Sequence, residues 1–292
     1  MIAQLQSLAV NMLEQGSLFG FLGLGVLLTF RFFRFPDLTA EGSYPLGGGV
    51  AAAMLAGGMH PLPAVLAAVA AGAGAGVVTA VIHTRLRINN IVAGIIVMTA
   101  LYTVNLRVMG RANISLLSAS TMFDRIGAFL PGWRDAFVVI LVTSLLLAVV
   151  AAGIAWFLRT DLGLAVRATG ENEAMITGLG VDTARTKMIG LALSNGLIAL
   201  SGALVAQDHG FADIGMGAGI LVTGAAAVMI GEAMFGDGGI VRWIVATIAG
   251  VLIYRLLVAG ALRVGFDPVD LKLITAALLL AALSLPRLRA RR

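Results

Sequence analysis

Long apolar stretches alternate with short polar or charged ones along the whole chain. A helix needs about 20 apolar residues to cross the hydrocarbon core of a bilayer, so each stretch of that length predicts a membrane-spanning helix. The pattern predicts about nine spans, at approximately 15–33, 37–58, 62–83, 88–108, 135–158, 186–207, 217–235, 239–258 and 269–286. Residues 1–14 are too few and too mixed in polarity to cross alone. They stay unassigned, although their apolar residues could line one face of an interfacial helix.

Composition supports a membrane protein. Hydrophobic residues make up 59% of the 292 residues and charged residues only 12%, with a mean hydropathy of +0.98. Soluble domains keep about a quarter of their residues charged, so a soluble fold is excluded. The 37 glycines favour close contact between helices in lipid. We therefore predict an all-α polytopic transmembrane bundle that forms a single domain over residues 1–292.

The charges indicate orientation in the membrane. The net charge of +5 would suit nucleic-acid binding, but the basic residues lie in short clusters between apolar runs. The positive-inside rule then favours an extracytoplasmic N-terminus and a cytoplasmic C-terminus. With that orientation, thirteen basic residues are inside: Arg31, Arg34, Arg85, Arg87, Arg159, Arg167, Arg185, Lys187, Arg242, Arg287, Arg289, Arg291 and Arg292. Seven are outside: Arg107, Arg111, Arg125, Arg134, Arg255, Arg263 and Lys272.

The residue types that carry chemistry are sparse. The absence of cysteine excludes disulfides, thiolate nucleophiles and iron–sulfur clusters. His60, His83 and His209 have no metal-ligand spacing, so we predict no metal site. No phosphate-binding loop of the G-x-x-x-x-G-K-[ST] type is present, so any ATP must be hydrolysed by another subunit. No set of catalytic residues clusters on the predicted spans, and an enzyme is the least favoured class.

The second predicted span begins with an irregular sequence. Residues 34–49 contain two carboxylates, Pro36, Pro45 and the Gly47–Gly49 run. Proline removes a backbone donor and glycine weakens a helix, so this pattern predicts a broken span. Unwound backbone at membrane depth must face protein or a watery cavity.

Four polar residues alternate along that sequence, namely Asp37, Thr39, Glu41 and Ser43. In an extended stretch they would point to one side and could line a translocation passage. The alternative places them at the inner interface, where Asp37 pairs with Arg34 and Ser43 or Glu41 caps the next helix. Both interpretations remain open.

Three further residues have two interpretations each. Tyr44 could stack on a solute ring or anchor the chain at an interface. Asn195 could contact solute in the passage or hydrogen-bond between helices. Glu232 is interpreted as a paired carboxylate near a span end, with Arg242 as a possible partner.

The longest polar connection, residues 159–187, predicts a cytoplasmic coupling loop. Residues 171–173 supply an acidic first turn, Ala174 to Ile176 an apolar ridge, and Gly178 a helix stop. This pattern indicates a short helix of the kind that docks into a partner's groove. The alternative is a loop that is only solvated.

Several stretches resemble permeases of ATP-binding cassette (ABC) importers of the branched-chain amino acid and ribose type. Residues 163–168, 171–174 and 178–182 resemble their coupling loop. Residues 195–204 resemble the small-residue span after that loop, and 236–242 a later glycine-rich turn. The run 37–43, D-L-T-A-E-G-S, is similar to the start of a subgroup associated with uptake of aromatic amino acids. The resemblance covers nearly the whole chain.

The resemblance implies a multi-pass permease subunit of a bacterial inner membrane, without enzymatic activity of its own. Such a subunit pairs with a second permease copy or homologue and receives a small solute, such as an aromatic or branched-chain amino acid, from an extracytoplasmic binding protein. A separate ABC ATPase, which holds ATP and Mg, drives it.

Within the coupling loop, Glu171, Glu173, Ala174 and Met175 are the candidate ATPase contacts, and Arg167 is expected to stabilise the loop. The alternative class is an ion-coupled secondary transporter, which should show broken helices in both halves of the chain. Only one strong break, at 36–49, is visible.

Overall fold

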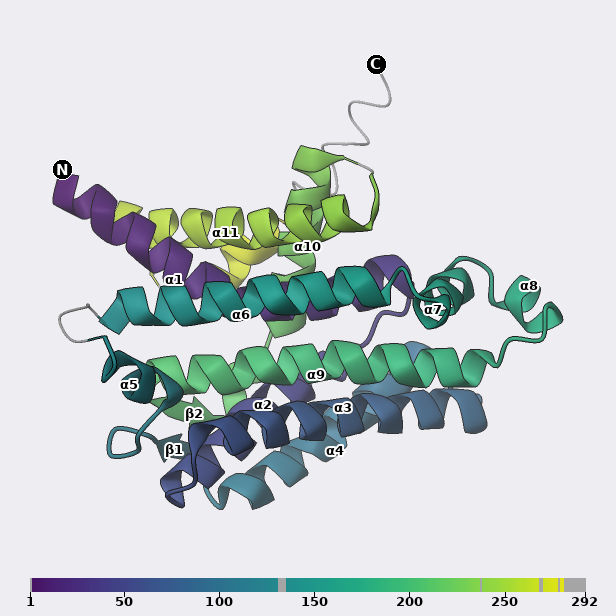
Figure 1. Cartoon of the computed structure of the whole chain (residues 1–292), viewed down its shortest axis with the longest axis horizontal. Helices are drawn as coiled ribbons and strands as arrows, with labels where there is room; N and C mark the ends of the chain where they lie inside the picture. Colours follow the sequence, from purple (N-terminus) through teal and green to yellow (C-terminus); the bar gives the residue numbers. More distant parts are fainter. Residues whose placement is uncertain (1, 131–134, 237, 268–269, 278, 281–292) are drawn as a thin grey trace.

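The computed structural model describes residues 2–130, 135–236, 238–267, 270–277 and 279–280 (Figure 1). The longer described helices are α1 (Ile2–Leu27), α2 (Ala40–Ala56), α3 (Pro61–Arg85), α4 (Asn90–Met109), α6 (Asp135–Phe157), α7 (Asp161–Glu171), α9 (Thr183–His209), α10 (Ile220–Phe235) and α11 (Ile240–Val264). The shorter elements are η1 (Leu28–Phe32), β1 (Asn113–Ser115), α5 (Met122–Gly127), α8 (Glu173–Gly178), β2 (Phe211–Asp213) and η2 (Ile214–Gly217). Residues 271–277 are also helical.

The helical, polytopic architecture is confirmed. Seven helical segments of the described chain are long and apolar enough to cross a membrane: 6–32, 61–85, 90–109, 135–157, 183–209, 214–235 and 240–264. The predicted count of about nine is not confirmed. Helix α2 has 17 residues and is not among the seven, and the predicted span 269–286 lies partly outside the described residues.

Residues 2–14, which the hydropathy pattern left unassigned, form the first turns of α1. The span-length segment begins at Gln6 and runs into the π-helical turn η1. Arg263, near the end of α11, donates a hydrogen bond to Ser7 at 2.7 Å. The N-terminal segment therefore continues the first span and does not form a separate interfacial helix.

The prediction of a broken second span is wrong for residues 40–56. Helix α2 is continuous through Pro45 and the glycine run, and the irregular backbone is confined to residues 34–39. Close packing explains why the helix persists, since a Cβ on Gly47 would overlap the backbone of α9 at Ala199. These glycines bring α2 against its neighbour, a use of small residues that is common in membrane bundles.

The ends of the helices gather into two distinct regions (Figure 1). At one end, β1 pairs antiparallel with β2, and Ile114 lies opposite Ala212. At this end the amide N–H of Met122, the first residue of α5, donates to the side chain of Gln207 at 2.9 Å. Helices α7 and α8 lie at the other end (Figure 1). The most buried segments, α1, α2 and α9, connect the two regions.

Candidate functional site

A buried polar cluster joins the irregular segment to the middle of α9. Asp37 is 1% exposed and accepts hydrogen bonds from the Thr39 amide at 2.9 Å and from Asn195 Nδ2 at 2.6 Å. Ser43 donates to Asn195 Oδ1 at 2.7 Å, and the Thr39 hydroxyl lies 2.7 Å from that of Thr79 on α3. Four predicted site residues, Asp37, Thr39, Ser43 and Asn195, are therefore brought together.

The partners of Asp37 clarify its two predicted roles. Arg34 does not pair with Asp37, because the Arg34 guanidinium binds Glu171 at 3.0 Å. Asp37 instead binds the backbone two residues on, a local turn that acidic side chains favour before a helix. The described donors to Asp37 are neutral, so hydrogen bonds hold this carboxylate at a buried position.

Glu41 and Tyr44 do not join the cluster, because α2 is helical where an extended row was expected. Glu41 Oε1 accepts from the amide of Gly219 at 3.2 Å, which connects α2 to the start of α10. Tyr44 is 1% exposed, and its ring centroid lies 6.2 Å from that of Phe19 on α1. The four alternating residues therefore do not line one side of an unwound strand.

The connection 159–187 is folded into two helices, so it is not simply a solvated loop. The side chain of Asn172 caps α8 by accepting from the Met175 amide at 3.0 Å. Glu171 is the last residue of α7, so the prediction that it begins the short helix is wrong; that helix, α8, begins at Glu173. Arg167 Nη1 donates to the Leu158 carbonyl at 3.4 Å, a contact that joins α7 to the residue after α6.

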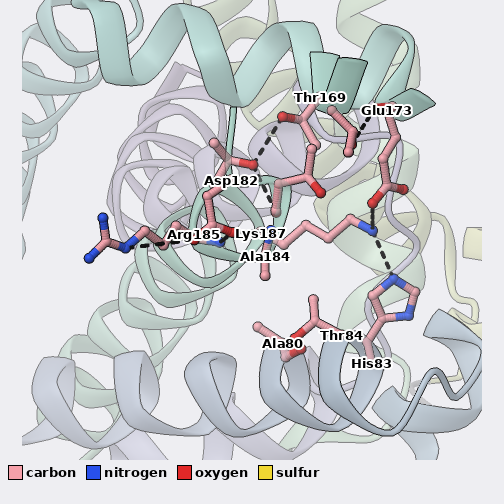
Figure 2. A network of polar contacts seen from close by, with 12 residues as sticks. Ala80, His83, Thr84, Thr169, Glu173, Asp182, Ala184, Arg185 and Lys187 are labelled. Carbon is pink, nitrogen blue, oxygen red and sulfur yellow. Dashed lines mark hydrogen bonds and ion pairs between the residues drawn. The ribbon is translucent and has the colours of Figure 1, made fainter. Parts of the chain in front are cut away.

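Ion pairs and hydrogen bonds tie these short helices to the bundle (Figure 2). Lys187 on α9 lies between Glu173 of α8, at 2.6 Å, and the ring of His83 on α3, at 3.0 Å. The hydroxyls of Thr169 and Thr186 lie 3.0 Å apart and join α7 to α9. A displacement of α8 would therefore act directly on α9 and α3.

The outer face of α8 is partly apolar. Ala174 and Met175 are exposed, and Leu179 just beyond the helix is 72% exposed. Ile176 is buried and holds the opposite side of α8 against the protein. Exposed apolar residues beside Glu173 form the kind of surface that a partner protein covers.

A cleft of about 330 Å³ lies beside α7, between η1 and the start of α11. Arg31 stacks on Trp243, with its guanidinium carbon 4.0 Å from the ring centroid, and lies 4.0 Å from Glu232. Arg242 donates to the carbonyl of Phe235. The described ion-pair partner of Glu232 is therefore Arg31, and the predicted pairing with Arg242 is wrong.

A second cavity, of about 580 Å³, was missed by sequence reasoning. It lies between α1, α10, α11 and residues 271–277, and both Arg255 and Lys272 line it. The positive-inside count places Arg255 with the outer basic residues, although the predicted span 239–258 contains it; in the structure Arg255 lies within α11, which continues to Val264. An arginine within a long apolar run was the signal, since ionisable groups inside spans mark functional sites by default.

Comparisons with known proteins agree on one family. Residues 8–283 match the model of the family described as the permease component of branched-chain amino acid transport systems. A tyrosine transport system permease protein of Clostridioides difficile is 37% identical over 94% of this chain and 90% of its own length. The ribose import permease protein RbsC of Escherichia coli is 27% identical over 93% of this chain and 83% of its own length. The galactofuranose transporter permease protein YtfT of the same organism is 27% identical over 85% of this chain and 70% of its own length. No solved structure matches.

Proposed function

The chain belongs to the family of permease components of branched-chain amino acid transport systems, and from this premise we propose that it is the translocating subunit of an ABC importer. A separate ATPase would supply the energy, and an extracytoplasmic binding protein would deliver the solute. Two permease subunits, identical or homologous, would enclose the passage. The observation that carries the proposal is the folded pair α7–α8, which is exposed on one side and bonded to two long helices on the other.

We propose that the α7–α8 end is cytoplasmic and that the N-terminus is outside. Helix ends and connections on the α7–α8 side carry many of the basic residues, as the positive-inside rule requires: Arg31, Arg34, Arg85, Arg87, Arg159, Arg167, Arg185, Lys187 and Arg242. The tail Arg287–Arg292 lies outside the described residues. The opposite end exposes Leu117 and Phe129, by 91% and 84%, and these side chains support docking of a binding protein there.

In the proposed mechanism the ATPase binds the apolar face of α8. Closure of the ATPase would move α8, and the bonds of Lys187 would transmit that movement to α9 and α3. The buried cluster around Asp37 and Asn195 would hold the start of α2 against α9 in the state seen here. Movement of α9 would then either keep or break its contact with α2, and the position of α2 would open or close the passage. This is a rearrangement between discrete packed states.

The solute we propose is an aromatic amino acid. The support is comparative, because the relative named for tyrosine transport is more similar to this chain than the two named for sugars. A binding protein selects much of the solute in such systems, so the permease needs only a compatible passage.

Co-purification tests the proposed assembly. The tagged chain should retain an ABC ATPase encoded with it, and replacing Glu171 and Glu173 together by glutamine should reduce the amount retained. Replacing Arg125, which lies on α5 at the opposite end, by glutamine provides a matched control. An unchanged complex in the double variant would remove the coupling role from these carboxylates.

A further inference from the structure

The cavity of about 580 Å³ combines two cations with apolar walls. Among the described residues its lining includes Arg255 and Lys272 and no carboxylate. Aromatic and aliphatic side chains form most of the rest, including Phe19, Ile220 and Val258. A volume of this size is within the range of sites that hold small molecules, roughly 300–1,000 Å³.

Arg255 is positioned by a ring contact but has no counter-ion in the part of the chain that the structure describes. Its guanidinium carbon lies 3.3 Å from the centroid of the Phe19 ring. Its Nε is buried without a hydrogen-bond partner, and no described carboxylate is within ion-pair distance of the side chain. Arg255 as a whole is partly exposed, but it lies in a helix that spans the membrane, where a cation is costly unless it is paired, so this arrangement leaves room for an anion.

The walls around Arg255 are held in place by other contacts. The hydroxyl of Tyr254 lies 2.7 Å from that of Thr275 and 3.5 Å from that of Thr223, which joins α11 to residues 271–277 and to α10. The ring of Tyr44 contacts that of Phe19, on which the guanidinium stacks. Four separate segments therefore line the cavity, and hydrogen bonds between hydroxyl groups join three of them.

We infer that this cavity is a solute site in the membrane-embedded part of the permease, in which Arg255, assisted by Lys272, binds the carboxylate of an aromatic amino acid. This inference rests on the proposed import function and identifies where the solute pauses. The apolar wall accepts the side chain of the solute. Glu41 accepts from the amide of Gly219, which lines the cavity, so a carboxylate lies next to the site and could bind the solute's ammonium group.

The test measures binding to the permease without its binding protein. The full chain, in nanodiscs of phosphatidylcholine, is titrated with radiolabelled L-tyrosine, and tyramine, which lacks the carboxylate, serves as competitor. We expect tyramine to compete roughly tenfold to a hundredfold less well than tyrosine, the loss typical of one hydrogen bond to a charged group. Arg255→Gln should weaken tyrosine binding by a similar factor, and Arg255→Lys by less.

Arg263→Gln is the matched control, because Arg263 is on the same helix but bonds to Ser7 at its far end. Its tyrosine affinity should equal that of the unaltered chain. Equal competition by tyramine, unchanged binding in a folded Arg255→Gln variant, or no tyrosine binding by the unaltered chain would overturn the inference. So would an effect of Arg255→Gln only on binding of anionic phosphatidylglycerol, which would make a lipid headgroup the partner.

ATP-dependent uptake by the assembled complex separates this inference from the proposed function. If uptake requires ATP and the binding protein, but is the same with Arg255→Gln, the solute site is wrong and the import function stands. If the unaltered complex shows no ATP dependence, the import function itself is wrong.

Discussion

Replacing Glu173 by glutamine removes the ion pair between α8 and α9 while preserving the size of the side chain. Lys187 Nζ lies 2.6 Å from the Glu173 carboxylate, and the Lys187 side chain is only 11% exposed. A hydrogen bond between charged groups contributes about 1.5–3 kcal/mol. The Glu173 side chain is 50% exposed, so solvent reduces the contribution toward about 1 kcal/mol. A loss of that size shifts the balance between attached and detached α8 by about fivefold.

We therefore expect Glu173→Gln to uncouple hydrolysis from transport. In proteoliposomes that contain the whole importer, the number of ATP molecules hydrolysed per solute taken up should rise, while ATP hydrolysis itself continues. Arg185→Gln is the matched control, because its pair with Asp182 lies within one helix end and both side chains are largely exposed. If Glu173→Gln, Arg185→Gln and the unaltered chain give the same stoichiometry, the ion pair does not transmit force.

Three further predictions concern packing, the buried cluster and the partner surface. Gly47→Ala should lower the unfolding temperature of the purified protein, since overpacking costs about 1–3 kcal/mol. Gly74→Ala should not, because a Cβ at Gly74 meets nothing within 4 Å. Equal unfolding temperatures of the two variants would contradict this packing. Asp37→Asn should reduce stability and uptake, because the NH₂ group of the new asparagine would face a donor, the NH₂ group of Asn195 or the N–H of Thr39. The exchange of both residues, Asp37→Asn with Asn195→Asp, should restore part of the lost stability and uptake. A double variant no better than the single one would argue against the bond. Met175→Asp should reduce ATPase co-purification, since this exposed side chain lies on the proposed docking face, and full retention would place the docking surface elsewhere.

Hydropathy located the long helices well because lipid penalises any unpaired backbone, so a spanning helix must be both long and apolar. The connection 159–187 was recognisable because it is too polar to cross the bilayer, but the start of its short helix was predicted too early, since Glu171 ends α7 and Glu173 begins α8. The predicted span 239–258 already contains Arg255, but the positive-inside count grouped Arg255 with the outer residues, so its position within α11 was not used as a sign of a site.

Other errors came from contacts that are distant in sequence. Pro45 and the following glycines suggested a break, but α9 packs closely enough on α2 to keep it helical. Glu171, the partner of Arg34, is 137 residues away, and Asn195, the side-chain partner of Asp37, is 158 residues away. Local patterns suggested nearer partners for both side chains. The residues of the buried cluster were identified from the sequence, whereas their grouping required the fold.

Uptake by the reconstituted importer tests the central claim most directly. Proteoliposomes containing this chain and its ATPase should accumulate radiolabelled aromatic amino acid only with ATP on the ATPase side and solute-loaded binding protein on the other. Accumulation driven by a sodium or proton gradient alone, without ATP or binding protein, would contradict the account and favour an ion-coupled transporter.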